Sequence, residues 1–249
     1  MLKFFLYLLI PIFLVSCKDH DMKGSVKIDF TLSWSTKSYT AGNLNAHIDD
    51  TTYRFDSIHS SNFINISSIQ YFISDISLVS ASGSTLMLDD NGVHYIDLSV
   101  PSTLSWTSLR EMPAGVYDSV VFFFGLTSGV SGYFTDPPES NMFWPEQLGG
   151  GYHFMKIDGR WKNKSSDTVF NTFGLHFKAE DGIRLSFPQR VFMTEMGVVN
   201  LQINMALDKW FNVPPTWDFN QMGGAIMQNS TAQEVLKDRV KYIFSVVKK

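Results

Sequence analysis

One segment of the chain concentrates side chains that could bind a transition metal. It carries Trp144, three glycines at 149–151 and His153, together with Met142 and Met155. Neutral imidazole suits copper, and thioether sulfur favours Cu(I), whereas a hard cation such as calcium needs clustered oxygen ligands. The residue types therefore point to copper.

Two further histidines lie in segments with the pattern of strands. His176 alternates with an apolar row, so it points to the opposite side of its strand from that row. The row is Phe173, Leu175 and Phe177. If the chain around His153 is extended, His153 and Met155 share one face. The position opposite the apolar row leaves His176 free to meet a loop that carries Trp144, and His94 lies in the strand pattern at 93–98.

Each candidate also has a purely structural interpretation. A histidine taken alone is more often a hydrogen-bonded structural or surface residue than a metal ligand. Met142 and Met155 are often core filler, and Trp144 and Tyr152 could form an aromatic platform for a sugar. The three glycines do not predict a phosphate loop, because no Gly-Lys-Ser/Thr follows them and the next element has the pattern of a strand.

The N-terminus reads as a secretory signal. Residues 1–16 carry a single charge, at Lys3, and their apolar run is too short for a typical membrane span. The small and apolar residues before Cys17 resemble a bacterial lipobox, which implies cleavage before Cys17 and attachment of lipid to it. The alternative is a signal anchor followed by an ordinary thiol.

These features predict a signal peptide over 1–16, a lipidated tether over 17–25 and one domain over 26–249. The protein would be anchored to the bacterial outer membrane, on its periplasmic or outer side, and would contact the membrane only through the lipid.

Composition excludes several classes of function. The 249 residues include 20 Lys and Arg against 24 Asp and Glu, so no basic field is present to attract nucleic acid. Cys17 is the only cysteine, which excludes disulfides within the chain, cysteine-ligated zinc and, once it is lipidated, cysteine catalysis. No pair of carboxylates can be placed as a catalytic acid and base, so we do not expect an enzyme.

Strand patterns recur along most of the chain. Apolar and polar residues alternate over 26–34 and 198–207, and 120–126 is almost entirely apolar, as in a central strand buried on both faces. The sequence at 89–92, Asp-Asp-Asn-Gly, is typical of a hairpin turn. We predict an all-β, single-domain, antiparallel two-sheet β-sandwich with long functional loops.

The segment that carries the metal-binding side chains also resembles a known family. Residues 142–145, Met-Phe-Trp-Pro, and 151–159, Gly-Tyr-His-Phe-Met-Lys-Ile-Asp-Gly, closely resemble the MbnP-like family. Its members are copper-binding periplasmic or surface lipoproteins associated with methanobactin operons and di-haem peroxidases. Weaker matches, in the same order, extend the resemblance to most of the mature chain. They lie at 71–78, 94–97, 113–117 and 173–176.

The resemblance implies a sandwich with a mononuclear copper ion held by two histidines. Beside them lies a tryptophan that a di-haem peroxidase partner oxidises to kynurenine. In this sequence the tryptophan corresponds to Trp144 and the ligands to His153 and His176, with His94 as a third possibility. The sequence departs from the family around His176 and at Glu146, where some members carry a second tryptophan.

Two hypotheses about function follow. The first is a copper-binding lipoprotein of the cell envelope that acquires or buffers copper. The second is a lipid-anchored module that binds a glycan or a protein without a metal.

Overall fold

The computed structural model describes most of the chain from Lys23 onward. The described ranges are 23–34, 37–39, 53–54, 62–89, 92–108, 110–128, 139–163, 167–213 and 217–249. The predicted signal peptide and Cys17 lie outside these ranges. The first strand begins at Lys23, within the segment predicted as the tether.

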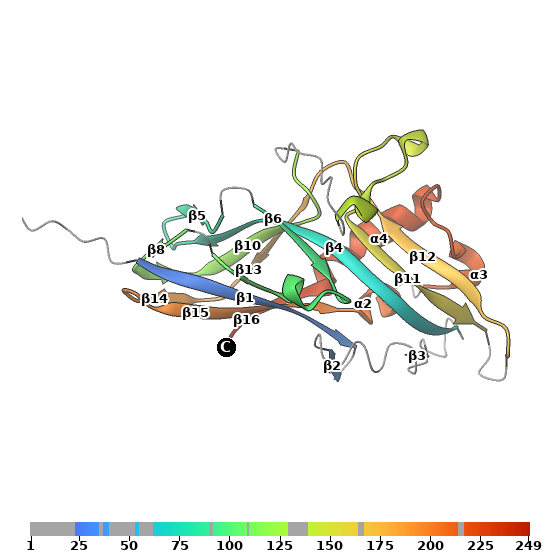
Figure 1. Cartoon of the computed structure of the whole chain (residues 1–249), viewed down its shortest axis with the longest axis horizontal. Helices are drawn as coiled ribbons and strands as arrows, with labels where there is room; N and C mark the ends of the chain where they lie inside the picture. The colour runs from blue at the N-terminus through green and yellow to red at the C-terminus, as the bar shows by residue number, and fades with distance from the viewer. Residues whose placement is uncertain are drawn as a thin grey trace, which may run out of the picture.

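The described residues form two main sheets and a small one (Figure 1). The larger sheet contains β3 (Tyr53–Arg54), β4 (Phe63–Val79), β5 (Thr85–Met87), β6 (Val93–Asp97), β10 (Ser119–Phe124), β11 (Met155–Lys162), β12 (Asn171–Phe177) and β13 (Ile183–Phe187). The second contains β1 (Lys23–Trp34), β2 (Lys37–Tyr39), β7 (Ser105–Thr107), β8 (Met112–Pro113), β15 (Val198–Ala206) and β16 (Phe244–Lys248). The small sheet pairs β9 (Gly115–Tyr117) with β14 (Val191–Met193).

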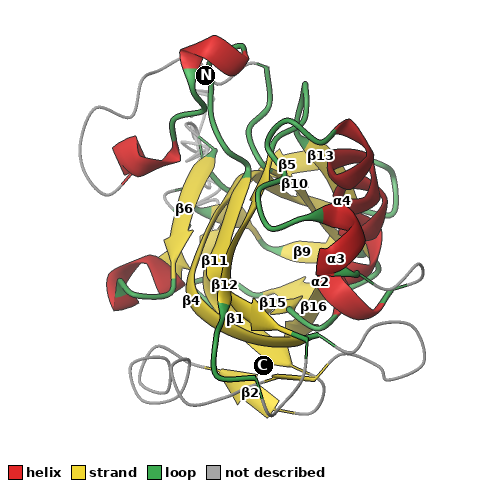
Figure 2. Cartoon of the chain, turned by 90° about the vertical axis from the view of Figure 1, so that its right-hand side faces the viewer, coloured by secondary structure: helices red, strands yellow, loops and turns green. Residues whose placement is uncertain are grey.

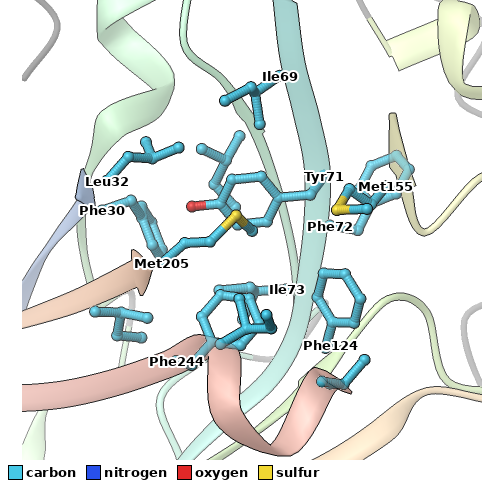
Figure 3. Packing of buried hydrophobic residues seen from close by; sticks show 14 of the residues in the cluster. Phe30, Leu32, Ile69, Tyr71, Phe72, Ile73, Phe124, Met155, Met205 and Phe244 are labelled. Atoms are coloured by element: carbon cyan, nitrogen blue, oxygen red, sulfur yellow. The ribbon is translucent and has the colours of Figure 1, made fainter. Parts of the chain in front are cut away.

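The prediction of an all-β sandwich is confirmed. The alternating residues of β1 and β15 are buried as the sequence indicated, and they meet side chains of the larger sheet in one core. Figure 3 shows Phe30 and Met205 from the second sheet beside Tyr71 from β4. Among the pairs of described strands, one departs from the antiparallel expectation, because β1 and β15 run parallel.

Strand β4 organises the larger sheet. Along one edge its first part pairs with β11 and its second part with β10. Phe72 lies at the change of partner: its N–H donates to the carbonyl of Phe154, and its carbonyl accepts from the N–H of Gly125. Gly125 has a φ of 89°, and a Cβ there would lie 2.0 Å from the ring of Phe154. Only glycine therefore fits this junction.

The strands on either side of 89–92 do not pair with each other as the predicted hairpin requires, and residues 90 and 91 themselves lie outside the described ranges. Strands β5 and β6 both pair antiparallel with β4, at residues 77–79 and 70–74, so they follow one another along the same edge. The Asp-Asp-Asn-Gly sequence connects two consecutive strands that run in the same direction. Turn residues indicate a change of direction, but they do not specify which strands pair.

Short helices occupy the connections. They are the 3₁₀ turns η1 (Pro101–Leu104), η2 (Glu139–Met142) and η3 (Glu146–Leu148), and the α-helices α2 (Lys209–Asn212), α3 (Phe219–Met222) and α4 (Ser230–Ile243). Helix α4 gathers with α2 and α3 on one side of the strands (Figure 2). None of the helices in the described part is long and apolar enough to cross a membrane.

His94 is buried where the two sheets meet. It lies on β6, and its ring centroid is 4.2 Å from that of Trp106 on β7 and 6.2 Å from that of Phe30 on β1. Its Nε2 has no hydrogen-bond partner. Burial lowers the pKa of His94 to about 4, although the charge of Asp89 acts in the opposite direction. The ring is therefore neutral at pH 7.

This burial predicts a specific loss of stability in acid. An unfolded histidine titrates near pH 6.5, so below that pH the unfolded chain takes up a proton that folded His94 does not. Stability is complete above about pH 6.5 and falls as the pH drops towards 4. We expect His94→Phe to reduce the loss in free energy of unfolding between pH 7 and pH 4 by about 3 kcal/mol. Urea unfolding at both pH values measures it, and an unchanged pH dependence in the variant would contradict the explanation.

Candidate metal site

His153 and His176 are neighbours in the structure. Their ring centroids are 4.9 Å apart, and the rings meet edge to face. Two imidazole nitrogens bound to one metal ion lie within about 4 Å of each other, because each metal–nitrogen bond is about 2 Å long. The separation of the two rings is compatible with this requirement.

His176 projects from β12 on the side away from the core. The apolar row predicted on this strand is buried, while His176 is only partly buried, so the predicted alternation is confirmed. Asp158 on β11 holds the ring, with 2.7 Å between its Oδ1 and Nε2 of His176. The carbonyl of His176 accepts a hydrogen bond from the side chain of Gln233 on α4.

The charge of Asp158 sets the tautomer of His176. Burial raises the pKa of the Asp158 carboxyl, but the interaction with His176, the charge of Lys156 and the hydrogen bond from Ser68 outweigh burial, so the net pKa is lowered. An ionised carboxylate can only accept a hydrogen bond, so Nε2 of His176 carries the proton. In the neutral ring, Nδ1 of His176 is then the nitrogen with a free lone pair. A carboxylate bonded to one ring nitrogen, with the other nitrogen left for the metal, is the arrangement that orients histidine ligands in metal sites.

Gly174 leaves room for this contact. It is the register partner of Asp158 across the β11–β12 pair. A Cβ at Gly174 would lie 2.9 Å from Nε2 of His176 and 3.1 Å from Oδ1 of Asp158. Any larger residue at this position would therefore press on the His176–Asp158 hydrogen bond.

His153 lies in the connection that leads into β11. Its N–H donates to the carbonyl of Met142 at 2.7 Å, next to a bridge between Phe143 and Tyr152. The side chain is 4% exposed, and its Nδ1 has no hydrogen-bond partner. Burial, with the charge of His176, lowers the pKa of His153 to about 3. The ring is therefore neutral at physiological pH, as a metal ligand must be.

Trp144 packs against this pair. Its ring centroid is 4.8 Å from that of His153 and 5.6 Å from Lys178 Nζ. Its Nε1 donates to the carbonyl of Leu148 at 3.1 Å, and Lys178 Nζ also donates to the carbonyl of Gly150. The three glycines have positive φ angles, which let this loop fold back under the tryptophan. The loop thus fixes Trp144 beside the histidines.

Two pockets open beside the cluster. One, of about 660 Å³, is bordered by Asp158 and His176 and by the 224–228 segment. The other, of about 570 Å³, is bordered by Trp144, Lys178 and α4. Small solutes can therefore approach both His176 and Trp144 from outside.

The two methionines do not join the site as the sequence suggested. Strand β11 begins only at Met155, and the chain bends at Phe154, so His153 and Met155 do not share a face. Met155 lies in the core, where Figure 3 shows it beside Phe72. Met142 is also completely buried in the core. The alternative interpretation of both residues as core filler is correct.

His94 is not brought to the other two histidines. Strand β6 pairs with one edge of β4, whereas β11 pairs with the other edge and β12 lies beyond β11. His94 and His176 are thus separated by three strand spacings, or about 14 Å across the sheet alone. Within the described residues, no group of three or more His, Cys, Asp or Glu side chains is arranged to hold a metal ion.

Asp158 is the residue that sequence reasoning missed. It lies inside the 151–159 segment, but nothing in its spacing links it to His176, which is on the next strand. The available signal was the outward position of Asp158 between Ile157 and Gly159, since an acidic residue facing outward on β11 can meet a histidine facing outward on β12. That inference needed the register of the two strands.

The tautomer of His176 can be measured directly. We expect nitrogen-resolved NMR of the metal-free protein to detect a proton on Nε2 of His176, because Asp158 accepts it. Gly174→Ala should keep the fold but displace the ring, and Asp158→Asn should weaken the preference for this tautomer. Ser68→Ala, which removes a hydroxyl bonded to the other carboxylate oxygen of Asp158, is a matched control that should retain the tautomer. A proton on Nδ1 in the unaltered protein would contradict this arrangement.

The chain is similar to a solved structure of MbnP from Methylosinus trichosporium, with 14% identity and a TM-score of 0.47 over 91% of this chain and 99% of that chain. No curated protein matches the chain. The family described as MbnP matches residues 23–230, which is most of the chain and includes Trp144, His153 and His176. The chain therefore belongs to the MbnP family.

Proposed function

We propose that this protein is a non-enzymatic copper-binding lipoprotein of the bacterial cell envelope that acquires or buffers copper. The observation that carries the proposal is the contact between the rings of His153 and His176. In this pair, the buried Nδ1 of His153 has no hydrogen-bond partner in the protein. Leaving a buried polar atom unpaired costs about 1–3 kcal/mol. A bound metal ion would supply the missing partner.

The donor set fits copper better than a hard cation. His153 and His176 would be the protein ligands, and the lowered pKa of His153 keeps its lone pair available well below neutral pH. Asp158 orients His176 through the nitrogen that does not bind the metal. Imidazole nitrogens suit copper, whereas calcium and magnesium prefer oxygen ligands.

The second feature of the site is the tryptophan ring of Trp144, which packs against His153. In this proposal a di-haem peroxidase partner oxidises Trp144 to kynurenine, as the family resemblance implies, and the modified side chain lies at the metal. The contact between the rings of Trp144 and His153 supports this part of the proposal. The pocket bordered by Trp144 gives the ring access to solvent although the side chain is only 6% exposed.

The lipid-anchored location is also part of the proposal. Cleavage before Cys17 and lipid attachment would place the domain at the outer membrane, on its periplasmic or outer side. Membership of the MbnP family and the methanobactin operons of the proteins it resembles fit a role in copper handling.

The alternative of a sugar-binding platform fits the geometry less well. A platform needs a flat aromatic face open to solvent, but Trp144 is buried and packs against His153 and Lys178. The Tyr152 ring is tilted against that of Phe143 and meets Phe72 edge to face, so its contacts are with these two rings.

Copper titration tests the metal site. We expect the mature chain with Cys17→Ser to bind one copper ion, and His153→Ala or His176→Ala to weaken binding at least a hundredfold, because each removes one of two protein ligands. His94→Phe is the matched control and should bind normally. The titration should be done under oxidising and reducing conditions. Binding that survives in both alanine variants, or that is lost in His94→Phe, would reject this site.

The modification of Trp144 has its own test. We expect peptide mass analysis of protein from its native host to detect kynurenine at residue 144 and unmodified tryptophan at position 161, which lies in β11 against Phe219. His153→Ala should leave the modification in place, because the peroxidase acts on the tryptophan. Unmodified Trp144 in a host that makes the peroxidase would contradict the proposal.

A further inference from the structure

A patch of exposed apolar side chains surrounds the start of β1. Phe192 is 52% exposed, Met196 82%, Val198 59% and Val116 43%. Val116 and Phe192 are register partners across β9 and β14. We call these four residues the β14 patch. Soluble proteins rarely leave neighbouring large apolar side chains open to water without a partner.

Backbone contacts place the β14 patch next to the entry of the chain. Ser25 N–H donates to the carbonyl of Gly197, and Ser25 is the register partner of Val198. A Cβ on Gly24 would lie 2.3 Å from the sulfur of Met193, the residue after Phe192. Lys23, the first described residue, therefore lies beside the patch, at the end of the molecule that carries β8 and β14 in Figure 1.

Met196 has an unusual backbone conformation. Its φ is 54°, one of two positive values among the described residues other than glycine. This conformation is unfavourable for an L-residue by about 1 kcal/mol, and glycine would avoid the cost. The turn nevertheless holds a methionine with its side chain in solvent. Such a combination favours a role for the side chain in contacts outside the domain.

Cations flank the aromatic member of the patch. The Arg190 guanidinium lies 5.4 Å from the Phe192 ring centroid and Lys248 Nζ lies 5.9 Å from it. Arg190 also forms an ion pair with Asp118 at 3.3 Å, and Glu195 adds a second acidic group next to Met196. An apolar centre rimmed by both signs of charge suits the zwitterionic headgroup region of a bilayer, where aromatic and long basic side chains concentrate.

The length of the connection to Cys17 limits how far the patch can lie from a membrane. From Cys17 to Lys23 there are 23 − 17, or six, residue steps, and an extended chain spans at most about 3.6 Å per residue. If Cys17 carries a lipid, Lys23 lies within about 22 Å of the bilayer. The exposed apolar side chains beside Lys23 are then within reach of the headgroups.

We propose that the β14 patch is a membrane-contact surface that rests on the phospholipid bilayer. In addition to the lipid on Cys17, the patch gives the domain a second contact with the membrane. This second contact fixes the orientation of the domain. Strands β11 and β12, which carry Asp158 and His176, lie at the opposite end of the molecule in Figure 1. The proposal does not depend on copper. It uses the lipid anchor only for the distance argument.

Vesicle flotation tests the surface without the anchor. The protein is the mature chain with Cys17→Ser, and the vesicles contain phosphatidylethanolamine and phosphatidylglycerol. We expect measurable partitioning that falls about tenfold or more in the double variant Phe192→Asp, Met196→Asp, because two apolar side chains lose their contact with lipid. Val169→Asp is the matched control: Val169 is 74% exposed and precedes β12. It should partition like the parent.

Thiol labelling tests the orientation in the lipidated protein. Lipid attachment consumes the only thiol of the chain, so Met196→Cys and Val169→Cys each carry one reactive cysteine. In vesicles of the same composition, a water-soluble maleimide should label residue 196 at least about tenfold more slowly than in the Cys17→Ser background. Residue 169 should react at equal rates in both.

Three outcomes would overturn the proposal. One is equal partitioning of the parent and the double aspartate variant, and another is equal loss in Val169→Asp. The third is a dimer in solution, detected by light scattering, that the double variant dissociates, since the patch would then bind a second copy of the chain. Circular dichroism of each variant distinguishes these results from unfolding.

Discussion

The change of partner along β4 is the constraint on which the site depends. Because β11 takes one part of the β4 edge and β10 the next, the chain must leave the sheet at Gly125 and return at Phe154, on either side of Phe72. The described residues between these two points, 126–128 and 139–153, form an excursion from the sheet whose ends are fixed. Trp144 and His153 lie in its last part. A rigid junction thus positions residues that belong to no regular strand, as functional loops on a rigid scaffold require.

The excursion returns next to the end of β12, where the N–H of Phe154 donates to the carbonyl of Phe177, and this explains how distant residues meet. His153 reaches the outer side because the chain bends at Phe154 before β11 begins. His176 reaches it through the alternation of β12, in which Phe173, Leu175 and Phe177 fill the core. The core residues of β12 therefore contribute to the site indirectly, since their burial fixes which way His176 points.

Local periodicity accounts for what the sequence could predict. Alternation identified β1, β15 and the outward position of His176, because one buried face fixes the register of a strand. The pairing of β5 and β6 with β4 could not be read in this way, since turn residues such as Asn-Gly carry no information on distant partners. The parallel pairing of β1 with β15 joins residues more than 170 positions apart, and no local pattern contains it.

The same limit applies to the site. Residue types and the family resemblance selected His153, His176 and Trp144, and the structure brings these three together. Asp158 was missed because its role follows only from its place across from Gly174 on the neighbouring strand. Met155 was misplaced because alternation was extended across a bend. Side chains that bind a metal are recognisable by their chemistry, whereas the groups that orient them depend on strand register, which only the folded structure defines.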